Sequence, residues 1–321
     1  MDLEPNELQV ELADAVRKLC GGRYPMETIR ASIGGVSVDR GRWAELADAG
    51  VFSLRLPESA GGLGLSMADA GVVFQELGRA LVPGPLVASH LAAGLVDGAA
   101  DGTTVVGLVE ARHTPILIEH LASTDRLLLL SDDGVRVVDA RALRGDAVAR
   151  PLDPLSPVTL VESLPAAEEL GGADLALRLR LEGACLTAAL LSGNAAASTV
   201  LATDYAKGRE QFGRAIGSFQ AVKHLLADML ARAELARAAV DAAAVTVDQP
   251  DAGDVMRAVS VAKLLAGEAA ILNGKSAIQV HGGMGFTWEV DAHLFLKRAW
   301  VLETHFGAGD DHAESLAATL V

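Results

Sequence analysis

The chain has 321 residues, of which 50% are hydrophobic and 4% aromatic, and its formal net charge at pH 7 is −15. A chain of this length and apolar content can bury a large core and can form two or three domains. The negative charge excludes nucleic acid as an expected partner, because a phosphate backbone binds to basic surfaces.

The two cysteines, Cys20 and Cys185, form no metal-binding or redox spacing. They fit buried thiols in a reducing compartment. No secretory signal pattern opens the sequence. We therefore expect a cytoplasmic protein without a metal site.

Residues 1–95 are predicted to form a helical domain. Apolar side chains recur near helical spacing over residues 8–16. Further helices are expected at residues 41–49 and 67–81. The glycines of residues 57–64 predict a loop between these two helices.

Residues 96–169 differ in character and are predicted to form a shortened β domain with a linker. Apolar runs of four or five residues, bounded by Asp, Gly and Pro, are typical of strands. Such runs occupy residues 105–109, 115–118, 126–130 and 135–138. The segment Asp132-Asp133-Gly134 favours a hairpin turn between the last two, and the prolines of residues 151–157 indicate the linker.

Residues 170–321 contain long helical patterns joined by short turns, which predict an antiparallel four-helix bundle. The patterns span residues 174–211, 218–247, 253–280 and 290–304. The most apolar stretch, residues 183–202, also carries Thr187, Ser192 and Asn194. These polar residues favour a buried bundle helix over a membrane span, so no membrane association is expected.

Two polar segments about 70 residues apart could together bind a diphosphate. The first contains Arg209 and Gln211, and an arginine can hold two phosphate oxygens at once. The second contains Gln279 and the pair Gly282-Gly283, where the backbone can approach a ligand closely and donate N–H groups. Taken alone, the first would be an ordinary helix-to-helix turn and the second an ordinary helix C-cap.

Both segments closely resemble signature motifs of the acyl-CoA dehydrogenase family: YAKGREQFGRAIGSFQAVKHLLADM (205–229) and QVHGGMGFTWEVDAHLFLKRA (279–299). The stretch PESAGGLGLSMADAGVVFQELGRAL (57–81) resembles the family's first domain. The resemblance covers residues 8–90 and 175–306. It implies a mainly α, acyl-CoA dehydrogenase-like fold with an N-terminal helical domain, a reduced middle β domain and a C-terminal antiparallel four-helix bundle.

The resemblance also implies a chemistry. Family members bind FAD, remove a proton from the α-carbon of an acyl-CoA thioester and pass a hydride from the β-carbon to the flavin, with an electron-transferring flavoprotein as the expected acceptor. Part of each FAD site in the family comes from a neighbouring subunit. The positions that match the family's FAD-binding residues are Arg209, Phe212, Gln220, Gln279, Gly282 and Gly283, with Gln211 as a further polar candidate.

Two elements of the family pattern are missing. The Thr- and Ser-containing segment that contacts the flavin ring has no counterpart between Leu91 and Leu170. The usual position of the catalytic base corresponds to Phe306, which cannot abstract a proton. Some members carry the base at the start of the first bundle helix, where Glu182 is the best candidate, and a surface or capping role is its alternative.

We therefore expect a subunit of an FAD-dependent acyl-CoA dehydrogenase that completes the FAD site of a catalytic partner. The resemblance is to family members that work as α2β2 heterotetramers on CoA thioesters of steroid side chains, so a steroid or other bulky acyl-CoA is expected by analogy. Two alternatives stay open. One is a homo-oligomeric dehydrogenase that uses Glu182 as its base, and the other is a non-catalytic scaffold or regulatory protein that no longer binds flavin.

Overall fold

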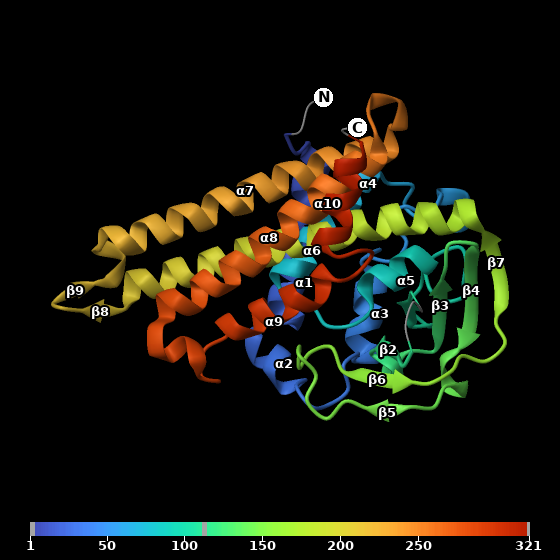
Figure 1. Cartoon of the computed structure of the whole chain (residues 1–321), viewed down its shortest axis with the longest axis horizontal. Coiled ribbons are helices and arrows are strands. Elements are labelled where there is room, and N and C mark those ends of the chain that lie inside the picture. Colours follow the sequence, from blue (N-terminus) through green and yellow to red (C-terminus); the bar gives the residue numbers. More distant parts are fainter. Residues whose placement is uncertain (1–3, 111–113, 320–321) are drawn as a thin grey trace. The chain divides into compact units, whose positions relative to one another are not determined.

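The computed structural model describes residues 4–110 and 114–319. Residues 1–3, 111–113 and 320–321, which belong to the three predicted domains, lie outside the described residues. The chain forms two compact units (Figure 1). We call residues 1–26, 71–82 and 184–321 the helical unit, and residues 27–70 and 83–183 the mixed unit.

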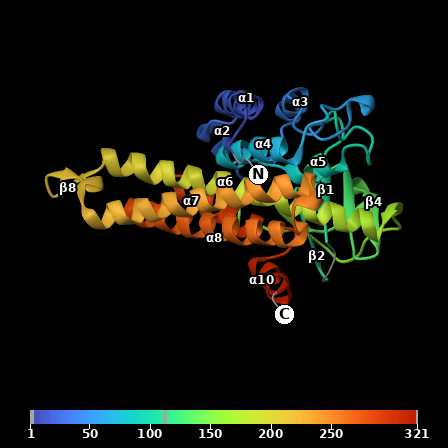
Figure 2. The ribbon, with the colours of Figure 1, turned by 90° about the horizontal axis from the view of Figure 1, so that it is seen from above.

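The helical unit contains the predicted bundle. Its bundle helices are α6 (Ala173–Gly208, whose first residues belong to the mixed unit), α7 (Gln220–Asp248), α8 (Val255–His281) and α9 (Ala292–Glu303). Figure 2 shows α6, α7 and α8 side by side along their length. The unit also includes α1 (Glu7–Arg23), most of α4 (Met67–Arg79), α10 (Gly309–Ala318) and 3-10 turns at Ile216–Ser218, Pro250–Ala252 and Gly282–Phe286.

A buried asparagine ties three bundle helices together. The side-chain nitrogen of Asn273 on α8 lies 3.1 Å from Thr199 Oγ1 on α6 and 2.8 Å from Met229 O on α7. Its side-chain oxygen accepts a hydrogen bond of 2.9 Å from Arg232 Nε. A buried amide without partners would cost about 1–3 kcal/mol, so these bonds favour one alignment of the three helices.

Two glycines allow α4 and α6 to cross at very close range. A Cβ at Gly78 on α4 would collide with the backbone carbonyl of Leu190, and a Cβ at Gly193 on α6 would collide with the carbonyl of Gln75. Each glycine therefore packs against the backbone of the opposite helix. The crossing depends on the absence of both side chains.

By length and composition, α6 is also the one helix in the described part of the chain that could cross a membrane. Its apolar window is 83% buried in the protein. Burial of this kind is typical of the core helix of a bundle.

The mixed unit is built around two small sheets. The first has the order β1 (Val106–Val109), β3 (Arg126–Leu130), β4 (Gly134–Asp139) and β7 (Glu168–Gly172); the second has the order β2 (Ile116–Glu119), β6 (Val158–Val161) and β5 (Asp146–Ala147). Only the β1–β3 pair is parallel among the described strands of these sheets. Their shared core includes Leu127 and Leu129 from the first sheet and Ile118 and Val161 from the second. The helices α2 (Met26–Ala31), α3 (Arg40–Asp48) and α5 (Leu86–Ala92), with 3-10 turns at Glu58–Ala60, Leu121–Ser123 and Ala140–Ala142, complete the unit.

The predicted fold class is confirmed, with a helical bundle and a reduced β region. The predicted hairpin turn is present, since β3 and β4 pair antiparallel with Leu130 opposite Val135. The strands β5, β6 and β7 and helix α5 were not predicted, because their short sequences show no clear period of their own. The division into three domains stays a prediction.

Candidate cofactor-binding site

The two motifs that resemble the FAD signature lie at the same end of the bundle, which we call the bundle tip (residues 205–220 and 279–291; Figure 1). The Tyr205 ring at the end of α6 stacks on the His281 ring at the end of α8, with centroids 4.1 Å apart. His281 is buried, and its Nδ1 lies 2.7 Å from the carbonyl oxygen of Ala277. A carbonyl can only accept, so Nδ1 carries the proton and His281 supports the loop.

An apolar cluster beneath these rings holds the two motifs together. It contains Ala202 and Ala206 from α6, Met229 from α7, and Ala277 and Val280 from α8. Small side chains dominate, so the helix backbones can approach closely. The fold thus brings together segments about 70 residues apart in the sequence.

The first motif forms a β-hairpin rather than a plain helix-to-helix turn. Strands β8 (Glu210–Gln211) and β9 (Arg214–Ala215) pair antiparallel around a two-residue turn, Phe212-Gly213. Both turn residues have positive φ, 54° and 78°, as a type I′ turn requires. A left-handed conformation costs a non-glycine residue roughly 1–2 kcal/mol. The Phe212 side chain is nevertheless 92% exposed, so burial in this chain does not compensate for the strain.

Several hydrogen-bond donors surround the tip without being used by the fold. Arg209 and Gln279 are exposed, and so is Gln220, the first residue of α7. In the described part of the chain, the Arg209 guanidinium makes no ion pair and no hydrogen bond. Gln211 is also exposed, and its amide nitrogen reaches only its neighbour's carbonyl, Glu210 O at 2.8 Å.

The second motif exposes backbone that no described side chain covers, at Gly282 and Gly283. Gly282 ends α8 with φ 59° and ψ −134°, a conformation that only glycine adopts easily. A Cβ at Gly282 or Gly283 would meet no atom within 4 Å, so ligand atoms could approach this backbone. Together with an unpaired arginine and three exposed amide side chains, this donor set fits the diphosphate of a dinucleotide. The tip residues therefore suit the ADP portion of FAD.

The turn at the usual base position holds no free carboxylate. Phe306 and Gly307 both have positive φ, 54° and 97°. Lys263 on α8, only 1% exposed, donates hydrogen bonds to the backbone oxygens of Glu303 (2.6 Å) and Gly307 (2.9 Å). A buried lysine therefore holds the strained turn in shape.

Two further side chains serve the same turn. His312 Nε2 lies 3.1 Å from Phe306 O, and its Nδ1 lies 3.1 Å from Ser260 Oγ. The carbonyl must accept, so Nε2 carries the proton and Nδ1 accepts from the serine. Glu303 Oε1 accepts the backbone N–H of Gly309 at 2.5 Å. The carboxylate nearest to Phe306 in sequence is thus engaged in the backbone of the turn.

Lys263 predicts a pH dependence of stability. Burial is the main cause that lowers its pKa from 10.5 to about 8, against the attraction of Glu303 and Asp311. Above about pH 8 the unfolded chain therefore binds more protons than the folded one, and stability rises with pH up to about 10.5. Relative to Lys263→Met, the wild-type free energy of unfolding should rise by about 1 kcal/mol between pH 8 and pH 9. Urea unfolding at both pH values measures this change. An equal change in the free energy of unfolding between pH 8 and pH 9 for wild type and Lys263→Met would contradict the prediction.

Glu182, the candidate base, lies near the start of α6 in the mixed unit. Its Oε1 forms an ion pair of 2.9 Å with Arg55 Nη1. The two side chains are 14% and 22% exposed. Oε1 of Glu182 is therefore engaged in the ion pair, so Oε2 would have to accept the proton if Glu182 is the base. Its role as a base stays a prediction.

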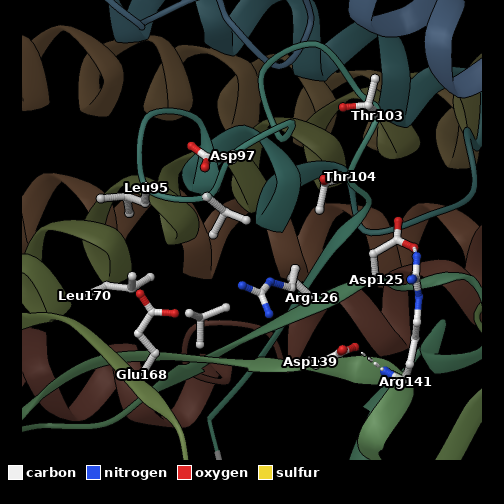
Figure 3. Close-up of a pocket in the computed structure, with 12 residues that line it drawn as sticks. Leu95, Asp97, Thr103, Thr104, Asp125, Arg126, Asp139, Arg141, Glu168 and Leu170 are labelled. Atoms are coloured by element: carbon white, nitrogen blue, oxygen red, sulfur yellow. Dashed lines mark hydrogen bonds and ion pairs between the residues drawn. The ribbon is translucent and has the colours of Figure 1, made fainter.

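A separate polar pocket of about 380 Å³ lies in the mixed unit (Figure 3). Figure 3 shows Arg126 in its middle, with Asp97 and Glu168 around it. On the side of the pocket away from Glu168 (right in Figure 3), Arg141 forms an ion pair of 2.9 Å with Asp125. Burial raises the pKa of Asp125, but hydrogen bonds from Arg40, the Val105 N–H and Arg141 lower it to about 2. Since the lining carries four carboxylates and two arginines, it is ill-suited to a diphosphate.

Sequence reasoning missed three residues of these sites. Lys263 is one, since nothing in the sequence shows that its acceptors lie 40 and 44 residues away. Arg214 and Phe219 are the others. The Arg214 guanidinium lies 4.1 Å above the Phe219 ring, and Phe219 meets Phe212 edge to face. The alternation of residues in a short hairpin could have drawn attention to Arg214.

Comparison with known proteins agrees with this geometry. Residues 6–101 match the family model for the N-terminal domain of acyl-CoA dehydrogenase, and residues 171–321 match that for its C-terminal domain. The chain is 33% identical over 311 residues to acyl-CoA dehydrogenase IpdE2 of Mycobacterium tuberculosis, covering 92% of each. It is 37% identical over 294 residues to acyl-CoA dehydrogenase FadE34 of the same organism, covering 80% of this chain but only 39% of FadE34.

Solved structures share the fold. A variant of the Tcur3481–Tcur3483 steroid ACAD matches with a TM-score of 0.84 at 24% identity, covering 97% of each chain. The ChsE4–ChsE5 complex from Mycobacterium tuberculosis matches with a TM-score of 0.85 at 23% identity, covering 100% of this chain and 99% of the other. Given the domain matches and the similarity to IpdE2 over nearly its whole length, the chain belongs to the acyl-CoA dehydrogenase family of FAD-dependent oxidoreductases.

Proposed function

We propose that this chain is one subunit of an FAD-dependent acyl-CoA dehydrogenase and that it completes the FAD site of a catalytic partner subunit. The reaction is the α,β-dehydrogenation of an acyl-CoA thioester. One observation carries the proposal: unused diphosphate donors gather at the exposed bundle tip, while Phe306 occupies the position of the usual base.

The residues of the tip have distinct roles in this proposal. Arg209 would bind two phosphate oxygens of FAD, and Gln279 and the backbone at Gly282-Gly283 would donate hydrogen bonds to the same diphosphate. FAD, when bound, supplies the acceptor for the hydride that leaves the β-carbon. Because Phe212 and its neighbours are exposed in this chain, a second subunit must cover them to exclude water.

The α-proton needs a carboxylate, and we propose that the partner subunit provides it. Phe306 cannot accept a proton, and Glu303 is hydrogen-bonded to the backbone N–H of Gly309. The electrons are then expected to pass to an electron-transferring flavoprotein. In this assignment the chain binds and orients the cofactor, and the partner removes the proton.

The partner and substrate assignments draw on relatives. ChsE4–ChsE5 is a complex of two proteins, and the Tcur3481–Tcur3483 pair is described as a steroid ACAD. We therefore propose a hetero-oligomer, α2β2 in stoichiometry, that acts on the CoA thioester of a steroid side chain or another bulky acid. This substrate assignment rests on analogy.

The test compares this chain purified alone with the same chain co-expressed with a candidate partner, a second acyl-CoA dehydrogenase-type protein from the same organism. Visible absorbance reports flavin, and native mass spectrometry reports the assembly. We expect flavin in the co-purified complex and none in the single chain.

Other outcomes separate the alternatives. Flavin bound by the single chain would indicate the homo-oligomer, in which Glu182→Gln should abolish turnover and retain flavin, while the exposed Glu162→Gln should change neither. A lack of flavin in both preparations would indicate the scaffold or regulatory protein.

A further inference from the structure

The hairpin at the bundle tip carries a second arginine, Arg214, for which the resemblance implies no role. In the register of the hairpin, Gln211 lies opposite Arg214, and the Ile216 N–H donates to the carbonyl of Arg209 (2.8 Å). Alternate residues of a strand point to the same face. Arg209, Gln211 and Arg214 therefore share one face of the hairpin.

The only carboxylate in the hairpin (residues 209–216), that of Glu210, lies on the opposite face. Glu210 pairs with Ala215, so both lie on the face away from the arginines. Neither arginine side chain has an ion pair or a hydrogen bond among the residues that the structure describes. Two exposed guanidinium groups on one face thus remain without an anion, in a chain whose net charge is −15.

The Arg214 guanidinium is nevertheless held in place. Its central carbon lies 4.1 Å above the Phe219 ring, and Phe219 in turn meets Phe212 with ring centroids 6.1 Å apart. Stacking on an aromatic face orients a guanidinium and leaves its N–H edge free to bind two oxygens of a phosphate. In the structure the Arg214 side chain thus stacks on the hairpin region itself, with its N–H edge exposed.

Two like charges on one face of a strand pair destabilise each other unless an anion joins them. Diagonal neighbours on an antiparallel pair lie roughly 7–8 Å apart, within reach of one ligand for two long side chains. A diphosphate carries a negative charge on each phosphate, so two arginines match it in charge and number. In a chain with a strongly negative field, such a local pair is also needed to attract an anion.

We infer that Arg214 is a second diphosphate-binding residue, which together with Arg209 holds the two phosphates of a bound dinucleotide. This inference rests on the proposed function, because it places the FAD diphosphate at the bundle tip. It adds Arg214 to the proposed cofactor-binding residues and gives a role to its position over the Phe219 ring.

The test uses the complex of this chain with its catalytic partner, freed of flavin and titrated with FAD. Flavin fluorescence gives the Kd, and native mass spectrometry follows the assembly. For Arg214→Gln we expect the Kd to rise about 10- to 100-fold, with a weaker dependence on salt and an unchanged mass. The Kd of Arg214→Lys should lie between those of the wild type and Arg214→Gln, because an ammonium binds one oxygen at a time. The matched control is Lys18→Gln, which removes one exposed positive charge from α1 and should leave the Kd unchanged.

Three results would overturn the inference. The first is a Kd for Arg214→Gln within about twofold of the wild-type Kd, while Arg209→Gln in the same complex releases FAD. That result would overturn this inference and leave the proposed function standing. Loss of assembly with unchanged flavin per remaining complex would mean that Arg214 meets a carboxylate of the partner protein. A wild-type complex that binds no FAD at all would overturn the proposed function as well.

Discussion

Replacement of Arg209 by glutamine is expected to release FAD from the complex of this chain with its catalytic partner. Arg209 is exposed at the bundle tip, where its charge is not used by the fold. A charge-assisted hydrogen-bond pair to a phosphate contributes roughly 1.5–3 kcal/mol. The Kd for FAD should therefore rise roughly 10- to 150-fold.

The measurement is a fluorescence titration of flavin-free complex with FAD at two salt concentrations. Because an ion pair with phosphate weakens with salt, the wild-type Kd should depend on salt more steeply than that of Arg209→Gln. Arg209→Lys keeps the charge but loses the two-pronged geometry, so it should give an intermediate Kd. Lys18→Gln again serves as the control for loss of one exposed charge. If Arg209→Gln folds, assembles and binds FAD as tightly as the wild type, the diphosphate does not lie at the bundle tip.

The bundle could be predicted closely from sequence because its signal is local. The pattern over residues 253–280 differs from α8 by only one or two residues at each end. Apolar residues at helical spacing are enough for this, since a long amphipathic helix has one stable way to bury them. Strand β7 was not predicted, because its sequence Glu168–Gly172 has no apolar alternation. Its strand character comes from pairing with β4, which is distant in sequence.

The cofactor site was predictable only in part, for a related reason. The presence of Arg209 and the glycine pair could be read from the sequence, and a resemblance gave them a common purpose. Their approach depends on the Tyr205–His281 stack, which is a tertiary contact. The side of the hairpin that Arg214 occupies depends on register, because a shift of one residue would turn it to the other face. Likewise, the burial of Lys263 depends on acceptors that the fold brings from 40 residues away.

The substitution Gly193→Ala is expected to destabilise the helical unit by about 3 kcal/mol, although alanine is normally the better helix former. Gly193 lies inside α6, and a Cβ there would overlap the backbone carbonyl of Gln75 on α4. Backbone atoms cannot rotate away as a flexible side chain can, so the two helices must separate. The matched control is Gly21→Ala in α1, where a Cβ would meet nothing within 4 Å. That change should stabilise the protein by about 0.5–1 kcal/mol, and urea unfolding measures both.

Gly78, the glycine of α4 at the same helix crossing, allows a further prediction for a double variant. Gly78 on α4 packs against the carbonyl of Leu190, one helical turn before Gly193. Once Gly193→Ala has pushed the helices apart, the space needed by an alanine at position 78 is already partly open. The double variant should therefore be less destabilised than the sum of the two single variants by about 1 kcal/mol or more. Additive effects would contradict a shared crossing, and they would mean that each collision is relieved by a separate local shift. Since neither glycine belongs to the bundle tip, FAD bound per folded complex should stay unchanged in all three variants.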